Sequence, residues 1–252
     1  MTTYVVIPDM QIPYHDRKLT EAFRQFLYQY DLDELLCVGD EIDQPQPSRW
    51  NKNMAGEYAG TLQRDIDATH AVIADMRNAI GDKPFHIMRS NHFDRTETYI
   101  RRYAPALAGL RDLNMVNLLG YPELNVTFHR QPYNFAPGWT LAHGDEGNLI
   151  KSAGGTALSL SRRWGRSVVA GHTHRLGLQH DHQSVGGRVV RHLFGVEAGH
   201  FMDMGKADYL NAGSANWQQG FVVLRKTGNV TVPQIVPVVG RTFTVEGVTY
   251  KW

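Results

Sequence analysis

Five short segments of the chain carry side chains of the kinds that bind divalent metals. They contain Asp9 and Gln11; Asp40 and Asp43; Asn91, His92 and Asp94; His143; and His172 and His174. Carboxylates, amide oxygens and imidazoles suit Mn²⁺, Fe, Zn²⁺ and Mg²⁺, and no thiolate accompanies them. Two Asp, one Asn, one Gln and three His among them are too many ligands for one open site. The set suits two ions that share a bridging ligand and lie about 3.5–4 Å apart.

Each segment ends an apolar run that has the pattern of a buried strand. The runs and their polar ends span residues 3–11, 34–43, 85–94, 138–145 and 167–174. The carboxyl ends of the strands in a parallel α/β sheet face one functional crevice. An Asp after a strand most often caps a helix or makes a turn, and a lone His is most often a satisfied surface or core group. Five such segments in order favour one shared metal site instead.

The elements between these strands predict the fold class. Helical spacing of apolar residues is present over 19–30, 56–80, 96–103 and 148–165. After Gly177 the pattern changes to strands, at 192–199, 220–225 and 229–239. We therefore expect an α/β protein with two packed mixed β-sheets flanked by helices, forming a single domain over 1–252. His180 and His182 are expected in a hairpin loop and are not assigned to a metal site.

The composition narrows the class of protein. The chain has 252 residues, a formal net charge of +1 and one cysteine, Cys37, inside an apolar run. A single cysteine cannot form a disulfide within the chain, and the charge gives no overall basic character. The start of the chain lacks the pattern of a secretion signal. No apolar run approaches the roughly 18–20 residues of a membrane helix. We expect a cytoplasmic protein without a membrane partner, and the oligomeric state stays open.

The order of the motifs resembles that of the calcineurin-like metallophosphoesterase superfamily. D-x-Q at Asp9, GDxxD at Asp40, SNH-x-D at Asn91, H at His143 and GHTH at His172 match the pattern D-x-H, GDxxD, GNH-[DE], H and GH-x-H of that family. The runs at 168–179, 194–204 and 215–224 are also similar to small phosphodiesterases of actinobacterial phages. The resemblance implies the four-layer αββα sandwich of the superfamily and, for a phage protein, action in the cytoplasm of the bacterial host.

The resemblance also implies a role for each motif residue. Asp40 would bridge two metal ions. His92 would face the scissile phosphate and either protonate the leaving oxygen or stabilise its charge, with Asp94 orienting it. Asp43 would support the metal loop. The first ion would be held by Asp9, Gln11, Asp40 and His174, and the second by Asp40, Asn91, His143 and His172.

Two positions depart from the family pattern. Ser90 replaces a glycine, which matters only where the backbone needs a positive φ. Gln11 replaces a histidine, and an amide oxygen is a harder and weaker donor than an imidazole. We therefore expect a weaker first site that favours Mn²⁺ or Mg²⁺ over Zn²⁺, with Fe also compatible with the ligand set.

The leading expectation is a metal-dependent phosphodiesterase acting on small nucleotides, including cyclic ones, by attack of a hydroxide that bridges the two metals. Arginines near the motifs, Arg95 and Arg102 among them, could hold a second phosphate or a nucleic-acid backbone. Trp50 and Tyr58 beside the long 41–57 loop could stack on a base. Packing and solvated surface are the alternatives for these side chains. A nuclease of the DNA-repair type, a phosphatase and a non-catalytic scaffold remain as rival functions.

Overall fold

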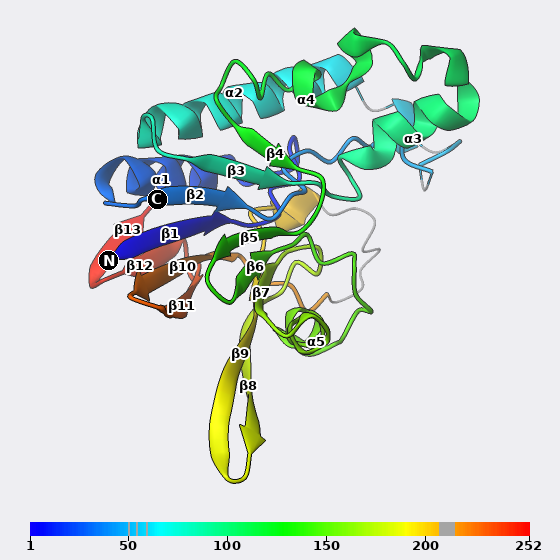
Figure 1. The fold of residues 1–252 in the computed structure, drawn as a ribbon. Coiled ribbons are helices and arrows are strands. Elements are labelled where there is room, and N and C mark those ends of the chain that lie inside the picture. The colour runs from blue at the N-terminus through cyan, green and yellow to red at the C-terminus, as the bar shows by residue number, and fades with distance from the viewer. Residues whose placement is uncertain (50, 54, 59, 207–214) are drawn as a thin grey trace.

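The computed structural model describes residues 1–252 except 50, 54, 59 and 207–214. Its elements form four layers, in which helices cover the outer faces of two β-sheets packed against each other (Figure 1). Both sheets mix parallel and antiparallel strands. The expected α/β fold with two packed mixed sheets and flanking helices is confirmed.

The first sheet has six strands in the order β11-β10-β1-β2-β3-β4. Strands β1 to β4 run parallel to one another. Beyond β1, β10 pairs antiparallel with β1, and β11 pairs antiparallel with β10. The strands span Thr2–Ile7 (β1), Glu34–Cys37 (β2), Phe85–Met88 (β3), Thr127–His129 (β4), Gly220–Thr227 (β10) and Val230–Pro237 (β11).

The second sheet has five strands in the order β5-β6-β7-β9-β8, with β6, β7 and β9 parallel. They span Tyr133–Ala136 (β5), Trp139–Leu141 (β6), Ser167–Ala170 (β7), Leu176–Val185 (β8) and Arg188–Ala198 (β9). A separate hairpin follows, formed by Thr242–Val245 (β12) and Val248–Lys251 (β13). It packs against α1, where Phe243 contacts Phe26 edge-on.

The α-helices are Arg17–Gln29 (α1), Leu62–Ile80 (α2), Asp94–Tyr103 (α3), Met115–Leu118 (α4) and Gly155–Trp164 (α5). Short 3₁₀ turns lie at Ala55–Tyr58, Pro105–Leu107, Arg111–Leu113 and Met204–Lys206. Helix α1 begins at Asp16, whose carboxylate accepts from the amides of Lys18 and Leu19. The predicted helix over 148–165 begins only at Gly155, because Gly154 has a left-handed backbone with φ 80°.

The alternation of side chains along β1 connects the layers. Val5 and Ile7 face α1 and α2 in the larger core, whereas Tyr4 and Val6 face the second sheet. A third cluster joins α5 to the outer face of the second sheet. Within the described residues, no helix is both long enough and apolar enough to span a membrane.

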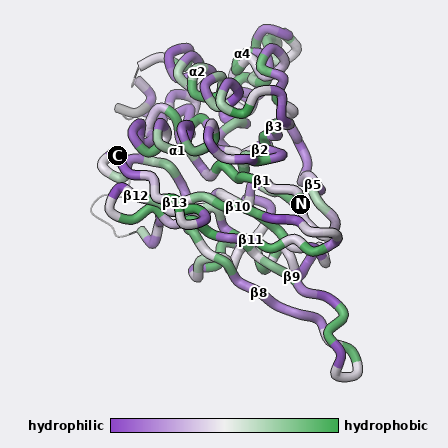
Figure 2. Tube along the Cα trace, turned by 90° about the vertical axis from the view of Figure 1, so that its left-hand side faces the viewer, coloured by the Kyte–Doolittle hydropathy of each residue, from purple (hydrophilic) through white to green (hydrophobic). Residues whose placement is uncertain are grey.

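Strands β8 and β9 continue beyond the second sheet as a long two-stranded hairpin that projects from the body of the molecule (Figures 1 and 2). Its turn is at Gly186 and Gly187, which both have positive φ. His180 and His182 lie within β8 and are paired with β9. The expectation that they sit in a hairpin loop was therefore wrong, because the paired strands run further than the glycines and polar residues suggested.

Candidate metal centre

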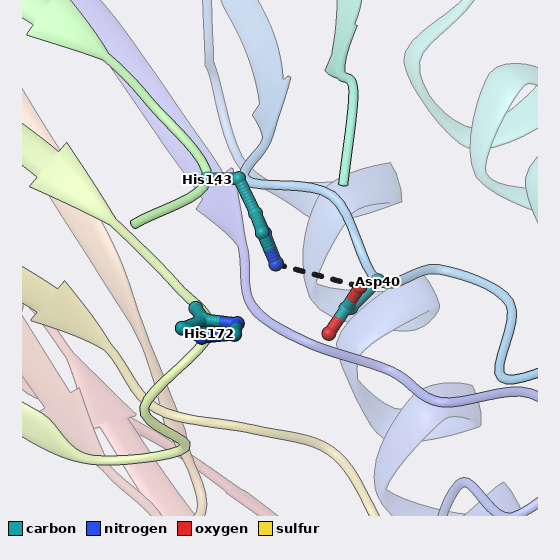
Figure 3. Close-up of side chains that lie close together, drawn as sticks. All are labelled: Asp40, His143 and His172. Carbon is teal, nitrogen blue, oxygen red and sulfur yellow. Dashed lines mark ion pairs between the residues drawn. The ribbon is translucent and has the colours of Figure 1, made fainter. Parts of the chain in front are cut away.

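The polar residues that follow β1, β2, β6 and β7 converge between the carboxyl ends of the two sheets. Ligand atoms of Asp40, His143 and His172 all lie within 4.8 Å of one another. Figure 3 shows these three side chains directed at a common point from three separate segments, with His143 Nε2 3.5 Å from Asp40 Oδ1. Three ligands so placed can hold one divalent cation.

A second triad shares Asp40 with the first. Ligand atoms of Asp9, Asp40 and His174 also lie within 4.8 Å of one another, and His174 Nε2 is 3.6 Å from Asp9 Oδ2. One buried carboxylate thus belongs to both triads, as a bridging ligand between two cations would.

The backbone at four of the candidate ligands is left-handed. Gln11, Asp40, His172 and His174 have φ of 55°, 52°, 67° and 56°, although none of them is glycine. Such conformations cost free energy and concentrate at functional sites. The backbone at Gly171 lies so close to Asp9 that only glycine fits there, since a Cβ at this position would lie 2.3 Å from Asp9 Oδ1.

The hydrogen bonds of His143 fix its tautomer. Nδ1 lies 2.9 Å from the carbonyl oxygen of Val38 and therefore carries the proton, which leaves a lone pair on Nε2. That lone pair faces Asn91 Oδ1 at 2.8 Å and Asp40 Oδ1 at 3.5 Å. Three acceptors that face one another repel unless a cation lies between them, so this cluster fits a metal.

The side chain of Gln11 lies next to the triad of Asp9, Asp40 and His174, which would hold the first ion. Its amide nitrogen donates to Asp40 Oδ2 at 2.9 Å and lies 3.3 Å from His174 Nε2. The amide NH₂ thus points at the two ligands that a cation would contact. A rotation of the amide by half a turn puts Oε1 in this position as a ligand.

Several buried polar atoms of the centre have no hydrogen-bond partner among the described residues. They are both carboxylate oxygens of Asp9, Oε1 of Gln11, Oδ1 of Asp40 and Nδ1 of His174. Leaving buried polar groups unpaired is costly, and bound cations would satisfy this concentration of them. The donor set therefore fits two divalent ions.

The charges of the centre also favour cations. Burial and the adjacent Asp40 raise the pKa of Asp9 well above its ordinary value. Burial alone would raise the pKa of Asp40, but His92, His143 and His172 hold it below its usual range. Burial lowers the pKa of both His172 and His174, which keeps these imidazoles neutral and able to bind metal.

His92 lies at the rim of the centre and is oriented by Asp43. Its Nδ1 is 2.8 Å from Asp43 Oδ1, and its Nε2 is 3.8 Å from Asp40 Oδ2. Arg95 Nη2 donates to Nε2 at 2.9 Å. Burial opposes the charged form of His92, but the carboxylates of Asp40 and Asp43 raise its pKa overall.

Asp94, which we expected to orient His92, is engaged elsewhere. It begins α3, and its carboxylate accepts from Arg89 Nε at 2.7 Å, while the same guanidinium donates to Asp145 at 2.6 Å. Arg89 thus ties the segment after β3 to the segment after β6. The orienting role expected of Asp94 is corrected to Asp43, because Asp43 is the carboxylate in contact with His92.

Sequence reasoning missed the supporting role of Glu197. Glu197 on β9 is fully buried and accepts from the amide of Thr156 and the hydroxyl of Thr173, each at 2.9 Å. Thr173 lies between the two histidines of the GHTH segment, so Glu197 fixes their loop. The sequence feature that could have revealed this role is the position of Glu197, an acidic residue inside an otherwise apolar run. Position 90 does not require a glycine, because the backbone of Ser90 does not have a positive φ. The hydroxyl of Ser90 accepts a hydrogen bond from the amide of Phe93.

A cavity of about 440 Å³ opens beside the centre, between the 46–57 segment and α3. Asn91 belongs to both the cavity and the centre. The rest of the lining is rich in cations and tyrosines, namely Arg49, Lys52, Arg95, Arg102, Tyr99 and Tyr103, with Glu57 as the acid. Of the two stacking candidates from the sequence, Trp50 lies outside the described residues and Tyr58 is largely exposed.

Comparison with solved structures supports the fold. Vps29 from Chaetomium thermophilum superimposes with a TM-score of 0.51, over 100% of this chain and 99% of that one, at 13% sequence identity. That likeness shows the fold alone, an arrangement of mixed β-sheets flanked by helices. The expected four-layer αββα architecture is therefore confirmed.

Sequence comparison gives closer relatives. No protein-family model matches the chain. The gene 54 protein of Mycobacterium phage D29 is 37% identical over 246 residues, and that of Mycobacterium phage L5 is 35% identical over 246 residues. Each alignment covers 96% of this chain and 96% of the relative. The chain therefore belongs to the family of the gene 54 proteins of mycobacteriophages D29 and L5.

Proposed function

We propose that the chain is a metal-dependent phosphodiesterase that hydrolyses small nucleotide phosphodiesters, including cyclic ones. The observation that carries this proposal is the sharing of the buried Asp40 by two ligand triads. Two cations bridged by one carboxylate form the kind of centre that clamps the attacking and leaving oxygens of an in-line displacement at phosphorus.

Each ion has its own ligand set. Asp9, Gln11, Asp40 and His174 would hold the first ion, and Asp40, Asn91, His143 and His172 the second. When bound, the ions supply positive charge at the phosphoryl oxygens and lower the pKa of water. The two amide oxygens in the set, from Gln11 and Asn91, favour Mn²⁺ or Mg²⁺ over Zn²⁺.

His92 would donate a proton to the leaving oxygen. Asp43 holds its Nδ1, so that Nε2 faces the centre beside Asp40. In the substrate complex, the leaving oxygen would replace Arg95 as the partner of Nε2. The Arg95 guanidinium would remain next to the negative charge that develops there.

The cavity beside the centre would receive the remainder of the substrate. Arg95 and Arg102 line it and suit a second phosphate or a ribose-phosphate group, and Tyr99 and Tyr103 present rings on which a base could stack. A volume of about 440 Å³ is in the range of pockets for small molecules. Because the relatives are phage proteins, we expect the enzyme to act in the cytoplasm of a bacterial host.

The proposal is tested by hydrolysis assays on the purified chain with Mn²⁺. The substrates are bis-p-nitrophenyl phosphate, 2′,3′- and 3′,5′-cyclic nucleotides, ADP-ribose and single-stranded DNA. We expect turnover of small diesters and, in His92→Asn, a loss of about 10²–10⁴-fold in kcat with unchanged Mn²⁺ content. His70→Asn, on α2, is the matched control and should keep full activity.

Two outcomes would contradict the proposal. Full Mn²⁺ occupancy without hydrolysis of any substrate would favour an interaction module. Preferred cleavage of single-stranded DNA, with binding that weakens steeply as salt rises, would favour a nuclease.

A further inference from the structure

Three histidines lie together on the projecting β8–β9 hairpin, outside the metal centre. His180 and His182 are two residues apart on β8, and His192 lies on β9. Residues two apart on a strand point to the same face of the sheet. The register pairs His182 directly with His192, so all three imidazoles share one face of the hairpin.

The distances between the rings describe a compact triangle. The centroids of His180 and His192 are 5.8 Å apart, those of His180 and His182 6.3 Å, and those of His182 and His192 6.5 Å. His180 also stacks on Phe194 at 5.1 Å, which gives the cluster one apolar wall. All three histidines are exposed to solvent, and therefore a cation can reach them.

The neighbouring carboxylate does not belong to the cluster. Asp181 alternates to the opposite face of β8, where its Oδ2 accepts from Arg162 Nε at 2.7 Å. A site on this hairpin would thus consist of three imidazoles and an open fourth position. Nitrogen ligands in this number suit Zn²⁺, Cu²⁺ and Ni²⁺, whereas Mg²⁺ and Mn²⁺ prefer oxygen.

We propose that His180, His182 and His192 form a separate binding site for a transition-metal ion, with Zn²⁺ as the representative ligand. The rings of His180 and His192 are now stacked at 19°, so binding requires the side chains to turn until one nitrogen of each points inward. Exposed side chains make such turns at small cost. The bound ion would link β8 to β9 and stabilise the part of the hairpin that lies outside the body of the molecule.

The test counts Zn²⁺ bound per chain by calorimetric titration at neutral pH, for the wild type and for His182→Gln and His192→Gln. We expect each variant to lose one zinc equivalent, or to bind that equivalent at least about tenfold more weakly. Asp181→Asn, on the opposite face of the same strand, is the matched control and should bind as the wild type does. Hydrogen exchange locates the site, since Zn²⁺ should slow exchange of hairpin amides in the wild type but not in His182→Gln.

Three results would overturn the proposal. The first is an unchanged zinc count in His182→Gln. The second is an effect of only one of the two variants, because the site needs both strands. The third is a loss of zinc without any difference in hairpin hydrogen exchange, which would place the missing ion elsewhere in the chain. None of these results depends on whether the chain hydrolyses phosphodiesters.

Discussion

At the residue scale, the identity of the candidate ligands could be read from the sequence but their conformations could not. The types and order of Asp9, Asp40, His143 and His172 predicted a shared site, and the structure brings them within reach of two cations. The left-handed backbone at Asp40 and His172 is a local cost that neighbouring structure imposes, and no residue type signals it. The contact between Asp43 and His92 was likewise hidden, because a spacing along the chain does not say which of two acids a ring will meet.

Gln11→His tests the metal preference of the first site. Histidine tolerates the positive φ of this position, and an imidazole nitrogen is a better donor to Zn²⁺ than an amide oxygen. We expect Zn²⁺ affinity to rise by at least about tenfold and the preference for Mn²⁺ over Zn²⁺ to fall. Metal content after equilibration with both ions measures this, with the exposed Gln63→His on α2 as the control. Equal Mn²⁺ to Zn²⁺ ratios in Gln11→His and the wild type would rule out Gln11 as a ligand.

At the element scale, the strands that end in ligands were the most predictable part of the fold. Continuous apolar runs predicted β1, β2, β3 and β7, since strands buried on both faces have no other pattern. The start of α5 and the length of the β8–β9 hairpin were not predictable. Both depend on glycine conformation and strand pairing that are settled only in three dimensions.

Glu197→Gln tests whether β9 supports the GHTH loop. The carboxylate accepts from Thr156 and Thr173, and an amide keeps only one acceptor oxygen, so one buried donor loses its partner. We expect a loss of about 1–3 kcal/mol in the free energy of unfolding. Because the loop carries His172 and His174, we also expect metal affinity to fall about 10–100-fold.

Chemical denaturation and metal titration measure the two effects of Glu197→Gln. The exposed Glu123→Gln is the control for the change of charge. If stability fell while metal affinity stayed at the wild-type value, Glu197 would support the core alone and not the loop.

At the scale of the whole molecule, the candidate metal centre lies where the two sheets meet. Asp9 and Asp40 follow strands of the six-stranded sheet, whereas His143 and His172 follow strands of the five-stranded sheet. Bound cations would therefore link the two sheets, and they would add to the free energy of unfolding because the unfolded chain lacks the site. The interface between the sheets is otherwise held by apolar packing around Val6 and its neighbours.

The stability of the whole molecule should also depend on two histidines that are not candidate metal ligands, His15 and His86. Burial lowers the pKa of His86 from 6.5 to about 4, with the charges of His129 and Arg77 acting in the same direction. The opposing acid, Glu34, is 3.9 Å away. Burial lowers the pKa of His15 to about 4 as well. The folded state therefore keeps both imidazoles neutral at a pH where the unfolded chain is already protonated.

The sign of the effect follows from the direction of these shifts. Above pH 6.5 neither state binds the extra protons and the stabilisation is complete, whereas between pH 6.5 and about 4 the unfolded state gains protons that the folded state does not. Each histidine should thus cost up to about 3 kcal/mol of stability as the pH falls through this window. His86→Gln should flatten the fall, and denaturant titrations of both proteins at a series of pH values measure the difference. Because metal is treated identically in all samples, parallel curves for His86→Gln and the wild type would mean that the His86 imidazole is protonated in the folded chain.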